Sequence, residues 1–298
     1  LSGMCERAVQ GPGVCAGMGT ANSMHIVCEA LGLALPGATP VLANSARMFE
    51  YAANSGRRIV EMVHENLLPR QILTPEAFEN AVRTALALSA SINTVRHLQA
   101  VAQEAQSEVD IYELFNRLGD EVPLLATIRP NGDSRIEDLE AAGGTAGVMK
   151  RLLPLLRKDA LTVTGATLGE NLARTPHVAS EHVRELSNPI STQASLLIMK
   201  GSLTPEGGIL KLGNAAEKAQ ALRGKARVFG GQAEAIAALG RGEITPGTIA
   251  VLRGMGPKGG PGMALASSFV AAVDGAGLSK TVAVVTDGQL SGLNRGIA

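Results

Sequence analysis

Apolar residues recur at helical spacing through most of residues 1–188, and this pattern predicts a series of amphipathic helices. The longest apolar stripe covers residues 43–67. The pair Thr74-Pro75 predicts another helix start, because threonine caps helices well and proline fits the first helical position. Further helices are expected over 20–35, 111–119, 145–156 and 167–173, and the helix after Thr74 should reach about 105 with a break near 89–93. Short apolar runs predict strands over 123–130 and 161–165.

The pattern changes after residue 188. Short apolar runs bounded by glycine, proline or charged residues predict strands over 196–201, 208–213, 226–231, 249–254 and 281–288. Two helices are expected between them, over 232–239 and 267–273. The expected fold class is α/β, with an N-terminal α/β domain with a parallel sheet over 1–188 and a β-barrel-like domain over 189–298, both incomplete.

The amino-acid composition limits the kinds of molecule that the chain can bind and the setting in which it works. The chain has 298 residues, which fits two domains. Its net charge is zero and aromatic residues make up 2%, which argues against a nucleic-acid partner. No apolar run reaches the roughly 18 residues that would span a membrane. The three cysteines are an odd number without disulfide spacing, which favours a reducing, cytoplasmic setting.

The glycine-rich stretch 11-GPGVCAGMGTANSM-24 places Cys15 just before a predicted helix start. Glycines let the backbone approach a bulky group, and a helix N-terminus favours the thiolate, the form that attacks or binds metal. Cys15 is therefore a candidate nucleophile or metal ligand. The alternative is a small buried residue in a tight turn, since free cysteine is among the most buried residue types.

Three other places carry candidate polar residues. Asn93 and His97 share a helix face, as a substrate contact or as an ordinary polar pair. The loop 254-GMGPKGGPGM-263 carries Lys258 and could cradle an anion or form a plain turn; its spacing is not that of a Walker P-loop. A predicted strand leads into 286-TDGQLSGLNRG-296, which carries Asp287 and Ser291 but does not match the nucleophile elbow of hydrolases.

Five of these stretches, in order along the chain, resemble motifs of the dihydroxy-acid dehydratase / phosphogluconate dehydratase family. They are the Cys15 stretch with its T-A-N-S-M end, Asn93-Thr94 with His97, 137-EDLEAAGG-144, 256-GPKGGPGM-263 and 286-TDGQLSG-292. The resemblance covers nearly the whole chain. It implies an α/β domain followed by a β-barrel domain, and a homodimer.

The resemblance also implies a chemistry. The expected enzyme is a hydro-lyase that converts a small 2,3-dihydroxy acid into a 2-oxo acid, in branched-chain amino acid biosynthesis. An iron–sulfur cluster, [2Fe–2S] or [4Fe–4S], acts as Lewis acid and Mg²⁺ holds the substrate. By the same resemblance, Cys15 is a cluster ligand and Ser291, as an alkoxide, removes the C2 proton. Asn93, His97, Lys258 and Asp287 are expected substrate contacts.

The chain departs from the family pattern at several positions. Leu265 stands where a glutamate ligand of Mg²⁺ is expected, Met255 replaces a glutamate, and Val9 replaces a cysteine that many members carry. The chain opens on Leu1, and we expect an internal piece, inactive alone, whose other cluster and metal ligands lie outside it. A sugar-acid dehydratase and a non-catalytic anion-binding homologue are the alternatives. Retention of both Cys15 and Ser291 argues against the second.

Overall fold

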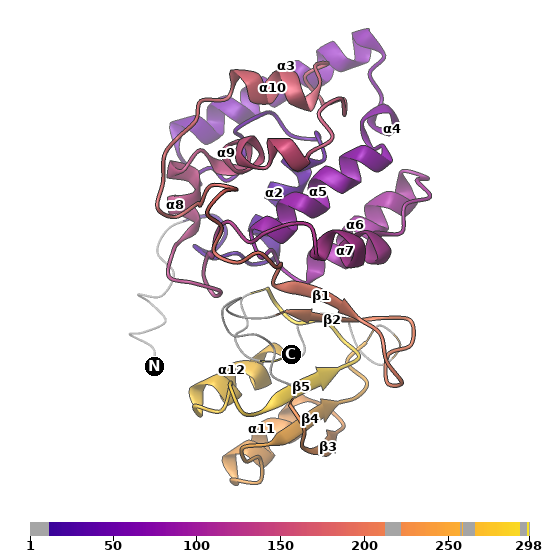
Figure 1. The fold of residues 1–298 in the computed structure, drawn as a ribbon, viewed down its shortest axis with the longest axis vertical. Coiled ribbons are helices and arrows are strands. Elements are labelled where there is room, and N and C mark those ends of the chain that lie inside the picture. Colours follow the sequence, from indigo (N-terminus) through magenta and orange to yellow (C-terminus); the bar gives the residue numbers. More distant parts are fainter. Residues whose placement is uncertain (1–11, 212–221, 257, 259–265, 293–296, 298) are drawn as a thin grey trace.

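A layer of helices forms the first part of the computed structural model, which describes residues 12–211, 222–256, 258, 266–292 and 297 (Figure 1). The longest helix, α3, lies at the end of the molecule away from the parallel strands. In chain order the helices are α2 (Thr20–Ala30), α3 (Ala46–Glu65), α4 (Pro69–Ile72), α5 (Pro75–Ala87), α6 (Asn93–Glu104), α7 (Ile111–Gly119), α8 (Ile136–Ala141), α9 (Gly144–Arg151), the 3₁₀ turn η1 (Leu153–Leu155) and α10 (Leu168–Arg174).

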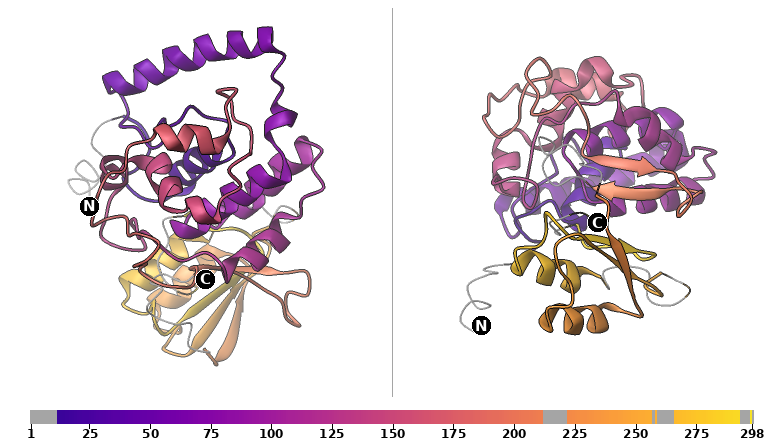
Figure 2. Two further views of the ribbon diagram at one scale, coloured as in Figure 1. Left: turned by 45° about the horizontal axis from the view of Figure 1, so that its top comes forward. Right: turned by 60° about the horizontal axis from the view of Figure 1, so that its bottom comes forward.

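The second part holds two small sheets. Strands β1 (Leu196–Met199) and β2 (Gly208–Lys211) form an antiparallel hairpin with Leu196 opposite Lys211. Strands β3 (Lys225–Phe229), β4 (Thr248–Leu252) and β5 (Ala283–Thr286) form a parallel sheet in that order. The crossover helices α11 (Gln232–Gly240) and α12 (Ser267–Gly275) lie on the same side of this sheet, as right-handed crossovers require (Figures 1 and 2).

The mixed α/β class expected from the sequence is confirmed, and the strands expected after residue 188 appear within a few residues of their predicted bounds. The described strands form two separate sheets and no closed barrel. The strands expected over 123–130 and 161–165 were wrong, because only single bridges form there. The amides of Leu125 and Ala126 instead donate to the carbonyl of Ala87, 2.8 and 3.3 Å away at the end of α5.

Helix α5 is the centre of the helical layer. Ten of its residues are buried, and Phe78 is completely enclosed. Its buried Asn80 side chain accepts from the amide of Arg157 at 2.7 Å and donates to the carbonyl of the same residue at 3.0 Å. A helix buried on nearly all sides fixes the segment that follows it, here residues 89–93, which enter the candidate site.

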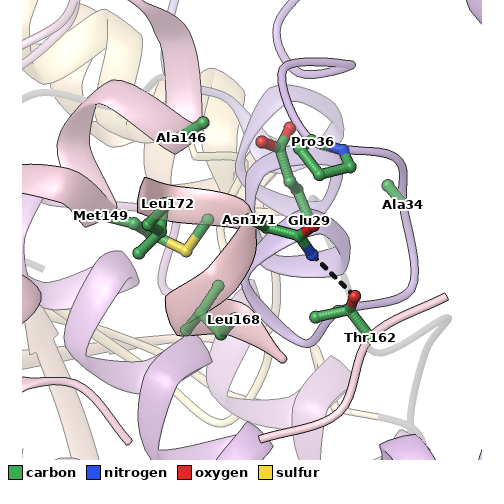
Figure 3. Close-up of a pocket in the computed structure, with 10 residues that line it drawn as sticks. Glu29, Ala34, Pro36, Ala146, Met149, Thr162, Leu168, Asn171 and Leu172 are labelled. Atoms are coloured by element: carbon green, nitrogen blue, oxygen red, sulfur yellow. Dashed lines mark hydrogen bonds between the residues drawn. The ribbon is translucent and has the colours of Figure 1, made fainter. Parts of the chain in front are cut away.

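Glu29 anchors the end of α2 from inside the fold. Its side chain accepts hydrogen bonds from the amide of Gly37 at 2.8 Å, the amide of Thr39 at 2.9 Å and the hydroxyl of Thr39 at 2.6 Å. Burial raises the pKa of Glu29 to about 7, against the lowering effect of these donors. Glu29 also lines a pocket with residues of α9 and α10, and no residue predicted to be functional lines it (Figure 3).

The buried Glu29 predicts a pH-dependent stability. The folded state keeps a proton that the unfolded chain releases, so the free energy of unfolding should fall as pH rises from about 4.5 to about 7, by on the order of 3 kcal/mol. In Glu29→Gln this component should vanish, because the amide does not titrate. Denaturant unfolding at several pH values measures the slope. The exposed Glu181→Gln is the control, and an unchanged slope in Glu29→Gln would contradict the prediction.

Candidate functional site

The turn that carries Ser291 packs directly on the start of α2. Gly292 makes this approach: a Cβ at this position would lie 2.6 Å from Ser91 Oγ and 3.1 Å from the carbonyl carbon of Gly19. Gly292 lies 201 positions after Ser91 and 273 positions after Gly19, and it belongs to the other part of the fold. Their contact brings the Ser291 turn, the N-terminus of α2 and the segment before α6 into one place.

Asn93 joins these three segments by hydrogen bonds. Its Nδ2 donates to Thr20 Oγ1 at 2.8 Å and to the carbonyl of Leu290 at 2.9 Å. Ser91 completes the group, since its Oγ lies 3.0 Å from Thr20 Oγ1 and accepts from the Asn93 amide at 3.2 Å. Asn93 is buried, and its Oδ1 has no partner among the residues that the structure describes. The side chain therefore fixes the carbonyl immediately before Ser291.

Ser291 itself is half-buried. Its amide donates to Ser267 Oγ at 2.9 Å, and Ser267 is the first residue of α12. The peptide group that joins Leu290 to Ser291 is thus held at both its carbonyl and its amide. It lies beside the N-terminal ends of α2 and α12, where unpaired amides and a partial positive charge favour an oxyanion.

Cys15 lies on the loop that leads into α2, four residues before Gly19. Asn22 shapes this loop, because its Nδ2 donates to the carbonyl of Cys15 at 2.8 Å and to that of Gly17 at 2.7 Å. The amide of Met18 donates to the carbonyl of Arg129 at 2.6 Å, which ties the loop to the helical layer. Cys15 is exposed. Its backbone is fixed while its thiol remains accessible to a ligand or a metal.

Asp287 locks the Ser291 turn to the loop after β4. Its two carboxylate oxygens accept from the amides of Gly254 at 3.0 Å and Met255 at 2.8 Å. The backbones touch closely, since a Cβ at Gly288 would lie 2.6 Å from the Met255 carbonyl oxygen. Asp287 thus holds the backbone here, besides its predicted contact with substrate. Lys258 is exposed, and Leu265 with most of the 257–265 loop lies outside the described residues.

The structure joins Asn93 to the Ser291 turn through the carbonyl of Leu290, and the substrate contact expected of His97 stays a prediction. His97 is half-buried one turn further along α6, and the hydrogen bonds of Asn93 go to Thr20 and Leu290. The sequence analysis missed Ser91 and Ser267, because a serine that only holds a backbone has no spacing signal of its own. Thr20 was inside the quoted T-A-N-S-M motif but had no assigned role.

The donor set of the described residues does not by itself complete a metal site. These residues contain no group of three or more His, Cys, Asp or Glu side chains that could hold an ion. Cys28 lies within α2, and burial raises the pKa of its thiol, which disfavours the metal-binding thiolate. Cys15 is the exposed thiol of the pair, and it can supply one ligand. A cluster held by a single cysteine lacks the ligand number that iron–sulfur sites use.

None of the helices that the structure describes is long and apolar enough to cross a membrane.

The close approach at Gly292 predicts a large effect of a single methyl group. In Gly292→Ala the new Cβ would overlap Ser91 Oγ, so the turn must move away from α2 at a cost of about 1–3 kcal/mol. Thermal unfolding measures the loss, and hydrogen exchange at residues 290–292 reports the opening. Gly240→Ala is the matched control, since no atom lies within 4 Å of a Cβ there. Equal behaviour of the two variants would refute the packing argument.

Comparisons with known proteins identify the same family as the sequence motifs. The family model described as dihydroxy-acid/6-phosphogluconate dehydratase N-terminal matches residues 1–171, and its C-terminal counterpart matches residues 181–298. A dihydroxy-acid dehydratase of Ignicoccus hospitalis is 45% identical over 98% of this chain and 53% of its own length. Those of Syntrophobacter fumaroxidans and Halothermothrix orenii are 43% and 41% identical, over 98% and 100% of this chain and 53% and 54% of their own lengths.

The chain therefore spans about half the length of the curated relatives that it matches. The two family models together cover nearly all of it, in the order that the motifs require. The chain belongs to the dihydroxy-acid/6-phosphogluconate dehydratase family.

Proposed function

We propose that this chain forms the proton-abstracting part of a hydro-lyase that converts a 2,3-dihydroxy acid into a 2-oxo acid. The observation that carries the proposal is the Ser291 backbone, held by Asn93 and Ser267 beside the starts of two helices. The names of the relatives, all dihydroxy-acid dehydratases, support the same reaction class.

Ser291 acts as the base in this proposal. Its alkoxide takes the proton from C2, the electron pair forms the C2–C3 double bond, and the C3 hydroxyl leaves as water after protonation. The resulting enol becomes the 2-oxo acid. A serine alkoxide is costly in water, so its stabilisation by nearby backbone amides and helix ends is the decisive contribution of the protein.

Cys15 is proposed as one ligand of an iron–sulfur cluster, [2Fe–2S] or [4Fe–4S]. When bound, such a cluster supplies a Lewis acid for the departing C3 hydroxyl. Cys15 suits this role because its thiol is exposed on a loop whose backbone is fixed by Asn22. Further ligands lie outside the described residues, and we assign none of the described residues to Mg²⁺.

The substrate is proposed to be a branched-chain precursor such as 2,3-dihydroxyisovalerate, used in branched-chain amino acid biosynthesis in the cytoplasm. The buried Oδ1 of Asn93, which has no partner among the described residues, is a candidate acceptor for a substrate hydroxyl. A sugar acid is the second candidate, because the matching family model also covers 6-phosphogluconate dehydratases.

Removal of the base should lower turnover without abolishing binding. In the full-length protein, prepared anaerobically, Ser291→Ala should reduce kcat by about 100-fold to 10,000-fold with a small change in KM. Formation of 2-oxo acid from 2,3-dihydroxyisovalerate and from a pentonate measures the effect and separates the two substrates. The exposed Ser202→Ala is the control. Normal turnover of Ser291→Ala would remove Ser291 as the base.

Removal of the thiol should affect the metal content. Cys15→Ser in the full-length protein should lose most of its iron and its visible cluster absorbance, because a hydroxyl is a poor ligand for a soft iron–sulfur site. Cys28→Ser should retain both, since that thiol lies inside α2. Iron and sulfide analysis with absorbance spectra provides the measurement. Full cluster content in Cys15→Ser would contradict the ligand assignment.

A further inference from the structure

Lys211 is the last residue of strand β2, and its side chain lies on the inner face of the β1–β2 hairpin. It stands opposite Leu196, and directly opposed residues of an antiparallel pair project to the same face. Leu196 is buried in the main hydrophobic core, and the next pair on this face, Ile198 and Ile209, packs against the same core. The surroundings of Lys211 on the hairpin are therefore apolar.

The ammonium group of Lys211 is buried without a counterion among the described residues. Its Nζ is enclosed and has no hydrogen-bond partner there. Burial lowers the pKa of Lys211 to about 7, because water no longer solvates the charged form. An enclosed amine with no acceptor costs free energy in either protonation state, and an ammonium costs more.

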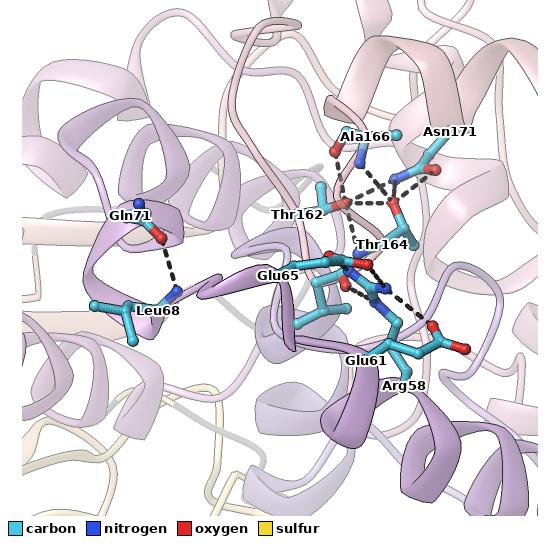
Figure 4. A network of polar contacts seen from close by, with 10 residues as sticks. Arg58, Glu61, Glu65, Leu68, Gln71, Thr162, Thr164, Ala166 and Asn171 are labelled. Atoms are coloured by element: carbon cyan, nitrogen blue, oxygen red, sulfur yellow. Dashed lines mark hydrogen bonds and ion pairs between the residues drawn. The ribbon is translucent and has the colours of Figure 1, made fainter. Parts of the chain in front are cut away.

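Other largely buried cations of the fold have carboxylate partners. The side chain of Arg58 is 13% exposed and pairs with Glu61 at 2.9 Å and with Glu65 at 2.5 Å, beside the polar network of α10 (Figure 4). The side chain of Arg151 is 1% exposed and pairs with Glu185 at 2.9 Å. The fold neutralises these charges internally. Lys211 differs from both arginines, and a bound anion would supply the partner that its chemistry requires.

A hydrogen bond connects the hairpin to the candidate site. Ser195, directly before β1, donates through its Oγ to Ser89 Oγ at 2.5 Å, and both residues are buried. Ser89 begins the segment 89–93, which carries Asn93 into the site. The hairpin lies between the helical layer and the parallel sheet, the same two parts that the Ser291 turn joins (Figure 1). The end of the hairpin that carries Lys211 therefore lies beside the segment that leads to Asn93.

The candidate site also contains two acceptors without donors. Asn93 Oδ1 and Gln289 Oε1 are enclosed and have no hydrogen-bond partner in the described part of the chain. Gln289 directly precedes Leu290, whose carbonyl Asn93 binds. Amide oxygens accept from hydroxyl groups and cannot donate to a carboxylate. A 2,3-dihydroxy acid has two hydroxyl donors and one carboxylate, so these oxygens suit its hydroxyls, and its carboxylate requires a cation.

We propose that Lys211 binds the carboxylate of the substrate. The identity of this ligand rests on the function proposed above. An ammonium–carboxylate pair is strong where water is excluded, and the substrate would bring the counterion that the described residues do not supply. Lys211 would hold the acid in place for Ser291 without taking part in bond making. It would also select for acids, since a neutral substrate would leave the ammonium unpaired.

Loss of the ammonium should weaken substrate binding more than turnover. In the full-length protein, prepared anaerobically, Lys211→Met should raise KM for 2,3-dihydroxyisovalerate about 10-fold to 100-fold with little change in kcat, because the carboxylate is bound equally before and during the reaction. Lys211→Arg keeps the charge and should recover part of the loss. Lys200→Met, exposed on the same hairpin, is the matched control. An unchanged KM in Lys211→Met would overturn the proposal.

Equilibrium binding tests the same contact without turnover. The probes are 2-oxoisovalerate and its uncharged methyl ester, measured by titration calorimetry. Lys211→Met should weaken binding of the acid about 10-fold to 100-fold and leave binding of the ester nearly unchanged. An equal loss of both probes, or no loss of the acid, would overturn the proposal. If the wild type forms no 2-oxo acid from dihydroxyisovalerate or a pentonate, the proposed function fails, while binding of the acid that depends on Lys211 would still support a carboxylate site.

Thermal unfolding without ligand separates a binding lysine from a structural one. Lys211→Met should unfold at a higher temperature than the wild type, because methionine fills a similar volume and removes a buried, unpaired amine. A lower unfolding temperature, or a failure of Lys211→Met to fold, would show that the protein itself supplies the partner of Lys211 and would overturn the proposal.

Discussion

The hydrogen bonds of one buried amide hold the candidate site together. Asn93 donates to the start of α2 through Thr20 and to the carbonyl before Ser291. Each bond contributes only about 1 kcal/mol net, but leaving a buried carbonyl or amide without a partner costs about 1–3 kcal/mol. Breaking this contact between the two parts of the fold would therefore cost more free energy than its small net contribution suggests.

The rest of the fold supports that amide. Helix α5 is buried on nearly all sides, so the segment that leaves its C-terminus enters the site along a fixed path. Ser91 on this segment donates its amide to Ser23 Oγ at 2.9 Å, which ties the segment to α2 a second time. Gly292 then permits the Ser291 turn to reach both. The candidate residues Cys15 and Ser291 lie on loops, and buried helices determine where those loops meet.

The sequence was sufficient to predict most helices and strands and the candidate functional residues, but it did not predict the hydrogen-bond partners of those residues. Apolar spacing and cap residues predicted α3, α5 and the strands after 188, because these signals are local. Residues 123–130 resemble a strand for the same reason, yet the amides of Leu125 and Ala126 donate to the carbonyl of Ala87 at the end of α5. Tertiary contacts therefore determine the conformation of this segment. The bond from Asn93 to Leu290 joins residues 197 positions apart, and no local pattern carries that information.

Three glycines of the 254–263 and 286–292 motifs have a physical role that their spacing alone does not reveal. Gly288 lies against the Met255 carbonyl, Gly256 against that of Asp287, and Gly292 against Ser91. At these positions, therefore, glycine is required by the closeness of two backbones. A loop of that kind can still bind an anion or a substrate, but its first task is to hold the turn with Ser291 in register. A side chain at any of these glycines would thus displace the serine before it altered any direct contact with a ligand.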